Sequence, residues 1–347
     1  MLRNKDREPN FDNFKRMLEK KPVDRPVLFD FIIGDEKMKT LIGDEFCDET
    51  YFDRIVSIIK SFDAAGYDFS PILLNGLIFP RNDGEEFLKQ TRSLNSGATI
   101  VDRESFNKYV WPENNANDFS VIQKAAEFMH SNAKLVPFAY DGILENVVGI
   151  VGYENLCYLQ YDDPELMAEI FKNVGSRIYE YYQRVLEYDE VGAIICNDDW
   201  GFNTQTMLSP EMLRKHVFPW YKKIVKAAHD KNKPAILHSC GYFEDIIEDI
   251  IEDMKFDGRH SYEDKIMPVE KAFEKYKGRI AILGGIDIDF IMRESKEAVI
   301  KRAKNLLSLS KEIGGYALGT GNSIPDYLPD ENIFALLKVG LDGFSKE

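Results

Sequence analysis

Short, nearly continuous apolar runs alternate along the chain with longer segments in which apolar residues recur at helical spacing. Such runs are typical of strands that are buried on both faces of a parallel sheet covered by helices. Strands are therefore predicted at 27–33, 67–74, 135–140, 191–196, 234–238, 280–286 and 316–318. Two weaker candidates lie at 97–102 and 258–261.

The segments between these runs carry helix signals. A long helical region is predicted over 144–188, with joints near Gly152 and at 162–164. Ser209-Pro-Glu is a good helix start, because it combines an N-cap hydroxyl, an early proline and an acidic first turn. Other helices are expected at 13–21, 51–65, 119–131, 209–230, 243–254, 269–276, 296–313 and from residue 330.

This alternation predicts a parallel sheet with crossover helices, which is an α/β fold. About eight or nine strands in 347 residues favour a closed (β/α)8 TIM barrel over an open, doubly wound sheet. The open sheet remains the alternative, although no glycine-rich dinucleotide loop follows the first strand. No composition break divides the chain, so we expect a helical extension over 1–25 and one barrel over 26–347.

Composition narrows the classes of partner. The net charge of −15 argues against a nucleic-acid surface, which needs clustered Lys and Arg. The charged N-terminus lacks an apolar signal core, and no apolar run approaches the length of a membrane span. The four cysteines are scattered without a disulfide framework. We therefore expect a soluble protein of the reducing cytoplasm that binds neither nucleic acid nor membrane.

The strongest chemical signal is His238-Ser-Cys240 at the end of an apolar run. Residues i and i+2 of a strand point to the same face, so this imidazole and thiol could bind one metal ion. Zinc takes both kinds of ligand. The alternative is a buried thiol beside a hydrogen-bonded histidine.

Polar side chains also follow several other predicted strands. In a (β/α) barrel these strand ends form the active-site mouth, and here they carry Asp141, Asn197-Asp198-Asp199, His260, Asp287 and Asn322. Either Asp198 or Asp199 could face the mouth as proton acceptor, metal partner or histidine orienter, or both could belong to an acidic turn before a helix.

Two further residues have open roles. Asn322 lies in Gly319-Thr-Gly-Asn-Ser, which is either a flexible turn or a loop whose glycines let the backbone approach a ligand. Trp200 is either a packing residue or a mouth aromatic that covers a flat ligand.

Read in order, several segments together resemble the uroporphyrinogen decarboxylase superfamily. They include the opening Phe14-Lys-Arg-Met-Leu to Pro26, Gly142-Ile-Leu-Glu145 with Gly152-Tyr-Glu-Asn155, Tyr161-Asp-Asp-Pro-Glu, Asp198-Asp-Trp-Gly201, His238-Ser-Cys-Gly241, Leu283-Gly-Gly-Ile-Asp287 and Gly319-Thr-Gly-Asn-Ser-Ile-Pro325. The resemblance covers essentially the whole chain and implies a (β/α)8 barrel, in agreement with the strand count.

The resemblance separates two branches. True decarboxylases carry an arginine-rich segment after the first strand and an inward aspartate near the second. Here those segments are Phe31-Ile-Ile-Gly34-Asp and Ile72-Leu-Leu-Asn75-Gly, without either feature. A porphyrinogen with many carboxylates would find few cations, so its decarboxylation is not expected.

The other branch comprises the corrinoid-linked methyltransferases of methanogens and acetogens, which serve anaerobic one-carbon metabolism. They hold zinc by a His-x-Cys pair, matched by His238 and Cys240, and by a cysteine from the last strand's loop. This chain has Asn322 near that third position, so Glu145, Cys196 or Asp199 would have to complete the site.

The resemblance thus implies a zinc-assisted methyltransferase that moves a methyl group between a small methylated compound, or a thiol or other acceptor, and a corrinoid on a partner protein. Asp198 and Asp199 would be catalytic, and Glu145, Asn197, Trp200 and Asn322 would bind substrate. The relatives are commonly dimers. Two alternatives remain, namely a metal-free decarboxylase of a smaller substrate and a non-catalytic barrel that binds a tetrapyrrole or corrinoid.

Overall fold

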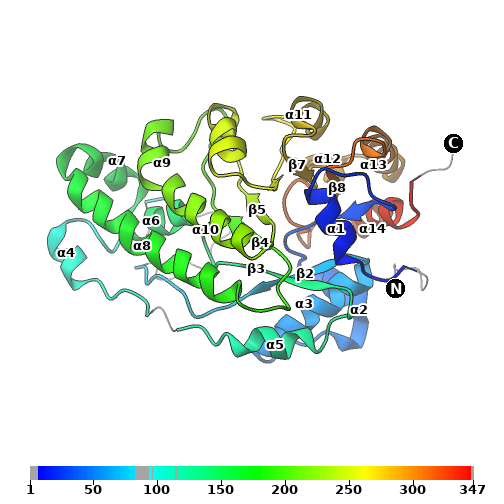
Figure 1. Ribbon diagram of the computed structural model, residues 1–347, viewed down its shortest axis with the longest axis horizontal. Helices are drawn as coiled ribbons and strands as arrows, with labels where there is room; N and C mark the ends of the chain where they lie inside the picture. The colour runs from blue at the N-terminus through cyan, green and yellow to red at the C-terminus, as the bar shows by residue number, and fades with distance from the viewer. Residues whose placement is uncertain (1–6, 83–93, 96, 114–115, 345–347) are drawn as a thin grey trace.

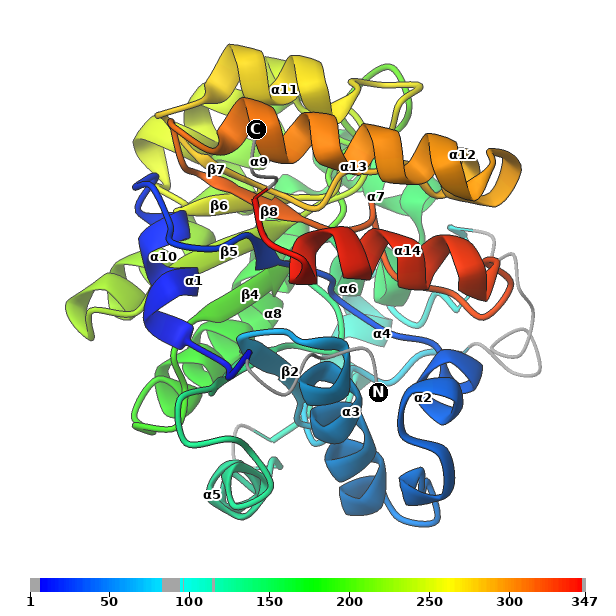
Figure 2. The same ribbon diagram turned by 90° about the vertical axis from the view of Figure 1, so that its right-hand side faces the viewer.

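A computed structural model describes residues 7–82, 94–95, 97–113 and 116–344 of the chain. Eight parallel strands occupy its centre, and helices surround them (Figures 1 and 2). The strands are β1 (Val27–Leu28), β2 (Phe69–Leu73), β3 (Lys134–Phe138), β4 (Ile194–Asn197), β5 (Ala235–His238), β6 (Gly258–His260), β7 (Ala281–Leu283) and β8 (Tyr316–Leu318).

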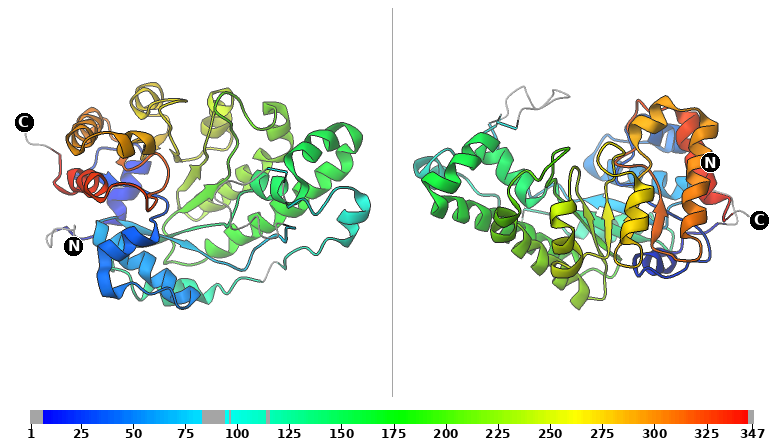
Figure 3. Two further views of the ribbon diagram at one scale, coloured as in Figure 1. Left: turned by 180° about the vertical axis from the view of Figure 1, so that it is seen from behind. Right: turned by 90° about the horizontal axis from the view of Figure 1, so that it is seen from above.

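Helix α1 precedes the first strand, and the other helices follow strands along the chain. They are α1 (Phe11–Leu18), α2 (Asp35–Ile42), α3 (Tyr51–Ala65), α4 (Arg103–Lys108), α5 (Ser120–Ala126), α6 (Ile143–Val151), α7 (Tyr153–Asp162), α8 (Pro164–Val185), α9 (Pro210–His216), α10 (Phe218–Asp230), α11 (Val269–Tyr276), α12 (Ile288–Arg293), α13 (Lys296–Ser310) and α14 (Asp330–Leu341). Helices α1 and α14 lie at one end of the molecule and α4 and α7 at the other (Figures 1 and 3).

The strands form a (β/α)8 TIM barrel, as the sequence predicts. Six of them pair in the order β1-β8-β7-β6-β5-β4, and β2 pairs with β3. A parallel bridge between Leu135 and Val191 links β3 to the segment that enters β4. Its hydrogen bonds run from Leu135 N to Glu190 O and from Gly192 N to Leu135 O, each 2.9 Å long. Between β1 and β2 the rings of Phe29 and Phe69 stack with centroids 5.5 Å apart.

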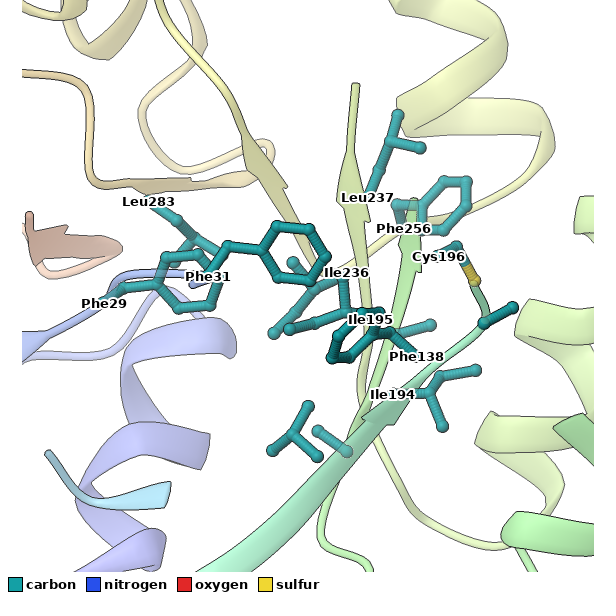
Figure 4. Close-up of a cluster of buried hydrophobic side chains, with 14 of the residues drawn as sticks. Phe29, Phe31, Phe138, Ile194, Ile195, Cys196, Ile236, Leu237, Phe256 and Leu283 are labelled. Atoms are coloured by element: carbon teal, nitrogen blue, oxygen red, sulfur yellow. The ribbon is translucent and has the colours of Figure 1, made fainter. Parts of the chain in front are cut away.

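The barrel interior is filled by large apolar side chains, so it is a packed core and not a pore. Phe29, Phe31 and Phe138 converge there on aliphatic residues of β4 and β5 (Figure 4). The rings of Phe31 and Phe138 meet edge to face at 4.7 Å. Full burial of such a side chain contributes roughly 1.5–3 kcal/mol. These buried side chains therefore stabilise the packing of the strands around the core.

The N-terminal helix α1 packs against the barrel from the strand N-terminal side. Its N-cap Asn10 accepts a hydrogen bond from Asn13 N, which satisfies one free N–H of the first turn. Phe14 is fully buried and meets the rings of Phe29 and Phe69. The opposite, C-terminal strand ends remain available for a site.

The predicted joints in the region 144–188 are confirmed. Gly152 has a positive φ of 80° and separates α6 from α7. Asp163 then caps α8, whose first residue is Pro164. A proline fits this position because the first N–H of a helix has no partner within the helix.

Several predicted elements differ in extent. Residues 97–102 form no strand; Gly97 makes one antiparallel bridge with Asn82, and Asp102 caps α4. The run 27–33 is a strand only over Val27–Leu28. Beyond it, the Asp30 carboxylate accepts hydrogen bonds from the backbone N–H and the hydroxyl of Thr320, which follows β8. Helix 119–131 is shortened to α5.

Two predicted helices are also interrupted. The segment 209–230 breaks at Val217 into α9 and α10, next to Pro219, which has no N–H to donate. The segment 243–254 forms a 3-10 turn η3 (Glu244–Ile246) and a π-helical turn η4 (Asp249–Asp253).

Across the described part of the chain, no helix combines the length and apolar character needed to cross a membrane.

Candidate metal and active site

Three potential metal ligands meet at the C-terminal ends of β4 and β5. One ligand atom from each of Asp199, His238 and Cys240 lies within 4.8 Å of the others. The Cys240 sulfur is 3.8 Å from His238 Nε2, so the predicted pair does aim at one point. Asp199 Oδ1 accepts a 2.7 Å hydrogen bond from the Cys240 backbone N–H, which brings its carboxylate to the pair.

A second histidine, His260 on β6, orients His238. His260 Nε2 lies 3.1 Å from the carbonyl oxygen of Thr320, which can only accept, so this nitrogen carries the proton. In neutral His260 the Nδ1 atom is then an acceptor, and it lies 2.8 Å from His238 Nδ1. His238 must therefore donate from Nδ1, which leaves the lone pair on Nε2, the nitrogen beside Cys240.

Both imidazoles are held in the neutral form that metal binding requires. Burial lowers the pKa of His238 well below its usual value, and His260 and Arg259 lower it further. Burial lowers the pKa of His260 to about 4. Arg259 is itself buried, and its guanidinium donates to the carbonyl oxygens of Ser261 and Ser239 at 2.6 and 3.0 Å.

The thiol of Cys240 is the group whose protonation a metal would change. Burial, and next the nearby Asp199 carboxylate, raise its pKa well above the usual value. Asn322 Nδ2 donates to the sulfur at 3.2 Å, so the residue near the family's third-cysteine position contacts the metal pair directly. A bound cation favours the thiolate, because its positive charge stabilises the negative sulfur that burial leaves without solvation by water.

The donor set fits zinc. Ligands about 2.0–2.3 Å from a tetrahedral ion lie roughly 3.3–3.8 Å apart, which is close to the observed sulfur–nitrogen distance of 3.8 Å. Imidazole, thiolate and carboxylate are all zinc ligands. No other trio of His, Cys, Asp or Glu in the described ranges gathers in this way. Of the three predicted substitutes for the missing cysteine, the structure brings Asp199 to the pair.

The two adjacent aspartates have different positions. Asp198 is fully buried and accepts from the backbone N–H groups of Leu144 and Glu145, both at 2.9 Å, at the start of α6. It also accepts from Trp200 Nε1 at 2.8 Å. Its pKa is raised to about 7 by burial. Asp198 therefore anchors α6 to β4, whereas Asp199 belongs to the candidate metal site with His238 and Cys240.

Trp200 and Cys196 lie away from the mouth. Trp200, for which the sequence predicts contact with substrate, is fully buried and packs against Phe218 and Tyr221. The reason is its indole N–H, which is committed to Asp198 and holds the ring in the core. Cys196 is also fully buried and does not join the metal group.

A pocket of about 360 Å³ opens beside Asp199. Glu145, which the sequence predicts to bind substrate, lines this pocket. Burial, together with Asp199 and Asp141, raises the pKa of Glu145 well above its usual value. The other residues that line the pocket are Arg81, Asp141, Leu94, Val148, Gly149, Gly201, Phe202 and Met207. A larger hollow of about 780 Å³ beside Asn10 and Leu341 is lined by no His or Cys among the described residues.

Sequence reasoning missed Arg81. Its Nη2 atom binds Asp141 Oδ2 at 2.6 Å and Asn146 Oδ1 at 3.0 Å. Its guanidinium also lies where a Cβ on Gly149 would stand, 2.3 Å from Cζ, so that glycine makes room for it. Arg81 lies eight residues beyond the end of β2, in a loop without periodicity, so no pattern marked it.

Asn197 is the last residue of β4 and faces the mouth. It is paired in register with His238, and registered residues of parallel strands point to the same side of the sheet. Only 8% of Asn197 is exposed, and its side-chain oxygen Oδ1 has no hydrogen-bond partner. A buried acceptor of this kind needs a donor, which a ligand can supply.

Comparisons with known proteins agree with the fold. The family model described as uroporphyrinogen decarboxylase (URO-D) matches residues 95–340. A methyltransferase from Methanosarcina mazei superposes with a TM-score of 0.71 at 17% identity, covering 96% of this chain and 98% of that one. A Listeria monocytogenes protein described as a vitamin-B12-independent methionine synthase gives 0.52 at 13% identity, covering 92% and 98%. No curated protein sequence matches the chain.

Proposed function

This chain belongs to the uroporphyrinogen decarboxylase (URO-D) family, and within that family we propose that it is a methyltransferase. It moves a methyl group between a small molecule and a corrinoid carried by a partner protein. The observation that carries this proposal is the Asp199–His238–Cys240 group at the barrel mouth. The fold shared with the Methanosarcina mazei methyltransferase supports it.

The three side chains would hold one zinc ion. Bound there, zinc would act as a Lewis acid that favours the deprotonated form of a thiol or a similar heteroatom at neutral pH. His260 fixes the His238 tautomer, and Asn322 donates a hydrogen bond to the Cys240 sulfur. Asp199 takes the place of the third cysteine that the methyltransferase branch uses, so the site would be an N, S, O site.

The remaining residues bind and position the small molecule. Glu145 and Asp199 line the pocket beside the metal group, and Asn197 offers its unpartnered oxygen on the same side of the barrel as His238. The pocket is too small for a tetrapyrrole at about 360 Å³. It suits a compound of a few heavy atoms, with the partner's corrinoid approaching from the mouth.

Decarboxylation of a polycarboxylate is less well supported. Such a substrate needs cationic side chains, and Arg81 is the one Lys or Arg among the described residues that line the pocket. Its guanidinium is already bound to Asp141 and Asn146. The structure gives no observation that favours this chemistry over methyl transfer.

The test is metal analysis combined with a methyl-transfer assay. The purified chain is expected to hold about one zinc ion, and His238→Ala, Cys240→Ala and Asp199→Ala should each lose it. The rate of methyl transfer involving cob(I)alamin should fall in the variants that lose the metal. Cys157→Ala is the matched control, because Cys157 is a half-buried thiol on α7 outside the metal group.

Other outcomes would overturn the proposal. A zinc-free chain after expression in zinc-supplemented medium, with no methyl transfer to cob(I)alamin, would contradict it. Release of carbon dioxide without metal would favour the decarboxylase alternative. Tight binding of a tetrapyrrole without turnover would favour the binding barrel.

A further inference from the structure

We propose that Asn322 and Ser261 prevent the Cys240 sulfur from accepting the methyl group, so that transfer is directed to the intended acceptor. Both side chains act as hydrogen-bond donors to that sulfur. This inference rests on the proposed function, because it concerns Cys240 as a metal ligand in a methyl-transfer site. It gives the two side chains a role in selecting the acceptor, which the metal group alone does not supply.

The thiolate of Cys240 would itself be a nucleophile in such a site. Its attack on a methyl carbon would form an S–CH3 bond, and the electron pair of the broken bond would stay with the leaving group of the methyl donor. The ligand would become a neutral thioether, which is only a weak acceptor. One such event would disable the site, so the protein must distinguish its own sulfur from the intended acceptor.

Asn322 is the first donor to the sulfur. Its Nδ2 atom donates to Cys240 Sγ at 3.2 Å. A thiolate can only accept, so the amide must present its nitrogen to it, and Asn322 Oδ1 then accepts from Ser323 Oγ at 3.2 Å. The loop reaches this position because Gly321 has no side chain; a Cβ there would stand 2.3 Å from the Tyr262 carbonyl oxygen.

Ser261 is the second donor. It is 3% exposed, and within the described part of the chain its Oγ has no nitrogen or oxygen partner. Burial and Asp199 raise the pKa of the Cys240 thiol, whereas a hydrogen bond from the Ser261 side chain lowers it. Arg259 ties the two segments together, since it donates to the Ser261 and Ser239 carbonyl oxygens at 2.6 and 3.0 Å. The sulfur is therefore the acceptor for this buried hydroxyl.

The two hydrogen bonds lower the nucleophilicity of the sulfur. A metal-bound thiolate has further lone pairs that accept from N–H and O–H groups, and these bonds take up part of its negative charge. Methylation would remove the charge and weaken both bonds. The ground state thus keeps a stabilisation that the transition state for methylation of Cys240 loses, which slows that reaction.

The test exposes the zinc-loaded full chain to iodomethane and follows methylation of each cysteine by peptide mass spectrometry. Asn322→Leu removes the donor and keeps the size of the side chain, and Ser261→Ala removes the hydroxyl. Each variant should be methylated at Cys240 at least about fivefold faster, because hydrogen bonds to charged acceptors are strong. Cys47 and Cys157 lie outside the metal group, so their rates should not change and serve as internal references.

A second measurement separates charge on the sulfur from access to it. In the cobalt(II)-loaded chain, the sulfur-to-cobalt charge-transfer absorption should move to longer wavelength in both variants, because a sulfur without donors gives up electron density more readily. Wider access alone would not move this band. Asn305→Leu is the matched control for Asn322→Leu, since Asn305 is exposed on α13 and is not part of the metal group.

The outcomes separate this inference from the proposed function. Variants that hold zinc but show unchanged methylation of Cys240 would overturn the inference and leave the metal site intact. Faster methylation with an unmoved cobalt band would also overturn it, because the side chains would then only shield the sulfur. The two variants alter different segments, so either one that folds and keeps its metal decides the question. A native chain that binds neither zinc nor cobalt would remove the proposed metal site, and the inference would fall with it.

Discussion

The Nδ1 atoms of His238 and His260 lie 2.8 Å apart, and this contact selects the nitrogen that His238 offers to a metal. The Thr320 carbonyl oxygen holds the His260 proton on Nε2. The proton of His238 is then held on Nδ1, and its Nε2 atom faces Cys240. The carbonyl oxygen of Thr320, in the loop after β8, thus orients His238 on β5 through the His260 ring.

Removal of His260 should weaken metal binding without removing a ligand. His260→Ala is expected to lower zinc affinity about 10- to 100-fold, as is usual for loss of a group that orients a ligand histidine. Competition with a chelator measures the affinity directly. His260→Asn should recover part of it, because an amide can still donate to Thr320 and accept from His238.

Two checks guard this prediction. His130→Ala, in a loop outside the metal group, should leave zinc affinity unchanged. A far-ultraviolet spectrum and a melting curve establish that each variant is folded. If folded His260→Ala bound zinc as tightly as the wild type, the orienting role would be wrong.

The loops that carry Asp199 and Cys240 touch through two glycines. A Cβ built on Gly241 would stand 2.0 Å from the Gly201 carbonyl oxygen, and Gly241 also has a φ of +82°. Gly241→Ala should therefore force the loops apart, lower the free energy of unfolding by about 2–4 kcal/mol and reduce zinc content.

Gly278→Ala is the matched control for the close contact. Gly278 has a similar φ of +77°, but nothing lies within 4 Å of its added Cβ. The Gly278→Ala variant should lose only about 1 kcal/mol of the free energy of unfolding, because of backbone strain, and should keep its metal. Chemical denaturation and zinc analysis measure both quantities. Equal losses in the two variants would show that the Gly201 contact is unimportant.

Much of the fold could be predicted, because strand burial leaves a periodic signal. The apolar runs that become β3, β4 and β5 are easily recognised, since parallel strands buried on both faces contain few polar residues. The positions at which the strands end were less predictable. Strand β1 ends after two residues, and beyond it Asp30 binds tertiary partners in the loop after β8, which no local pattern records.

The site was only partly predictable for a similar reason. His238 and Cys240 are two residues apart on one strand, so their common direction follows from strand geometry. Asp198 and Asp199 are adjacent, and which of them faces the mouth depends on the turn after β4. Trp200 has its position decided by a hydrogen bond to Asp198, which sequence does not show. Arg81 lies in a loop that has no hydrophobic periodicity, so no sequence pattern marks it.

The stability of the protein should respond to the ionisation of Asp30. This carboxyl group is fully buried, accepts hydrogen bonds from Thr320 and Tyr67, and has its pKa raised by burial from 3.8 to about 6. Between those values the folded state holds a proton that the unfolded state has lost. The free energy of unfolding therefore loses about 3 kcal/mol as the pH rises from about 4 to above 6.

Asp30→Asn should remove that loss, since the amide stays neutral and its oxygen can still accept from Thr320. Relative to the wild type, the variant should gain up to about 3 kcal/mol between pH 4 and pH 7. Urea unfolding at several pH values measures the difference. Asp24→Asn, with an 88% exposed side chain, is the control and should show no such trend. A constant difference between Asp30→Asn and the wild type would contradict the prediction.

The neighbouring aspartates should separate stability from metal binding. Asp198→Asn places an amide N–H₂ among the N–H donors of Leu144, Glu145 and Trp200, so it should lower the free energy of unfolding by about 1–3 kcal/mol. Asp199→Asn keeps an oxygen for Cys240 N–H but loses the charge that a cation binds, so it should retain stability and lose at least about tenfold in zinc affinity. Denaturation of the metal-free variants and chelator competition measure the two effects. The reverse pattern, with metal binding lost in Asp198→Asn and stability lost in Asp199→Asn, would mean that Asp198 is the carboxylate at the mouth.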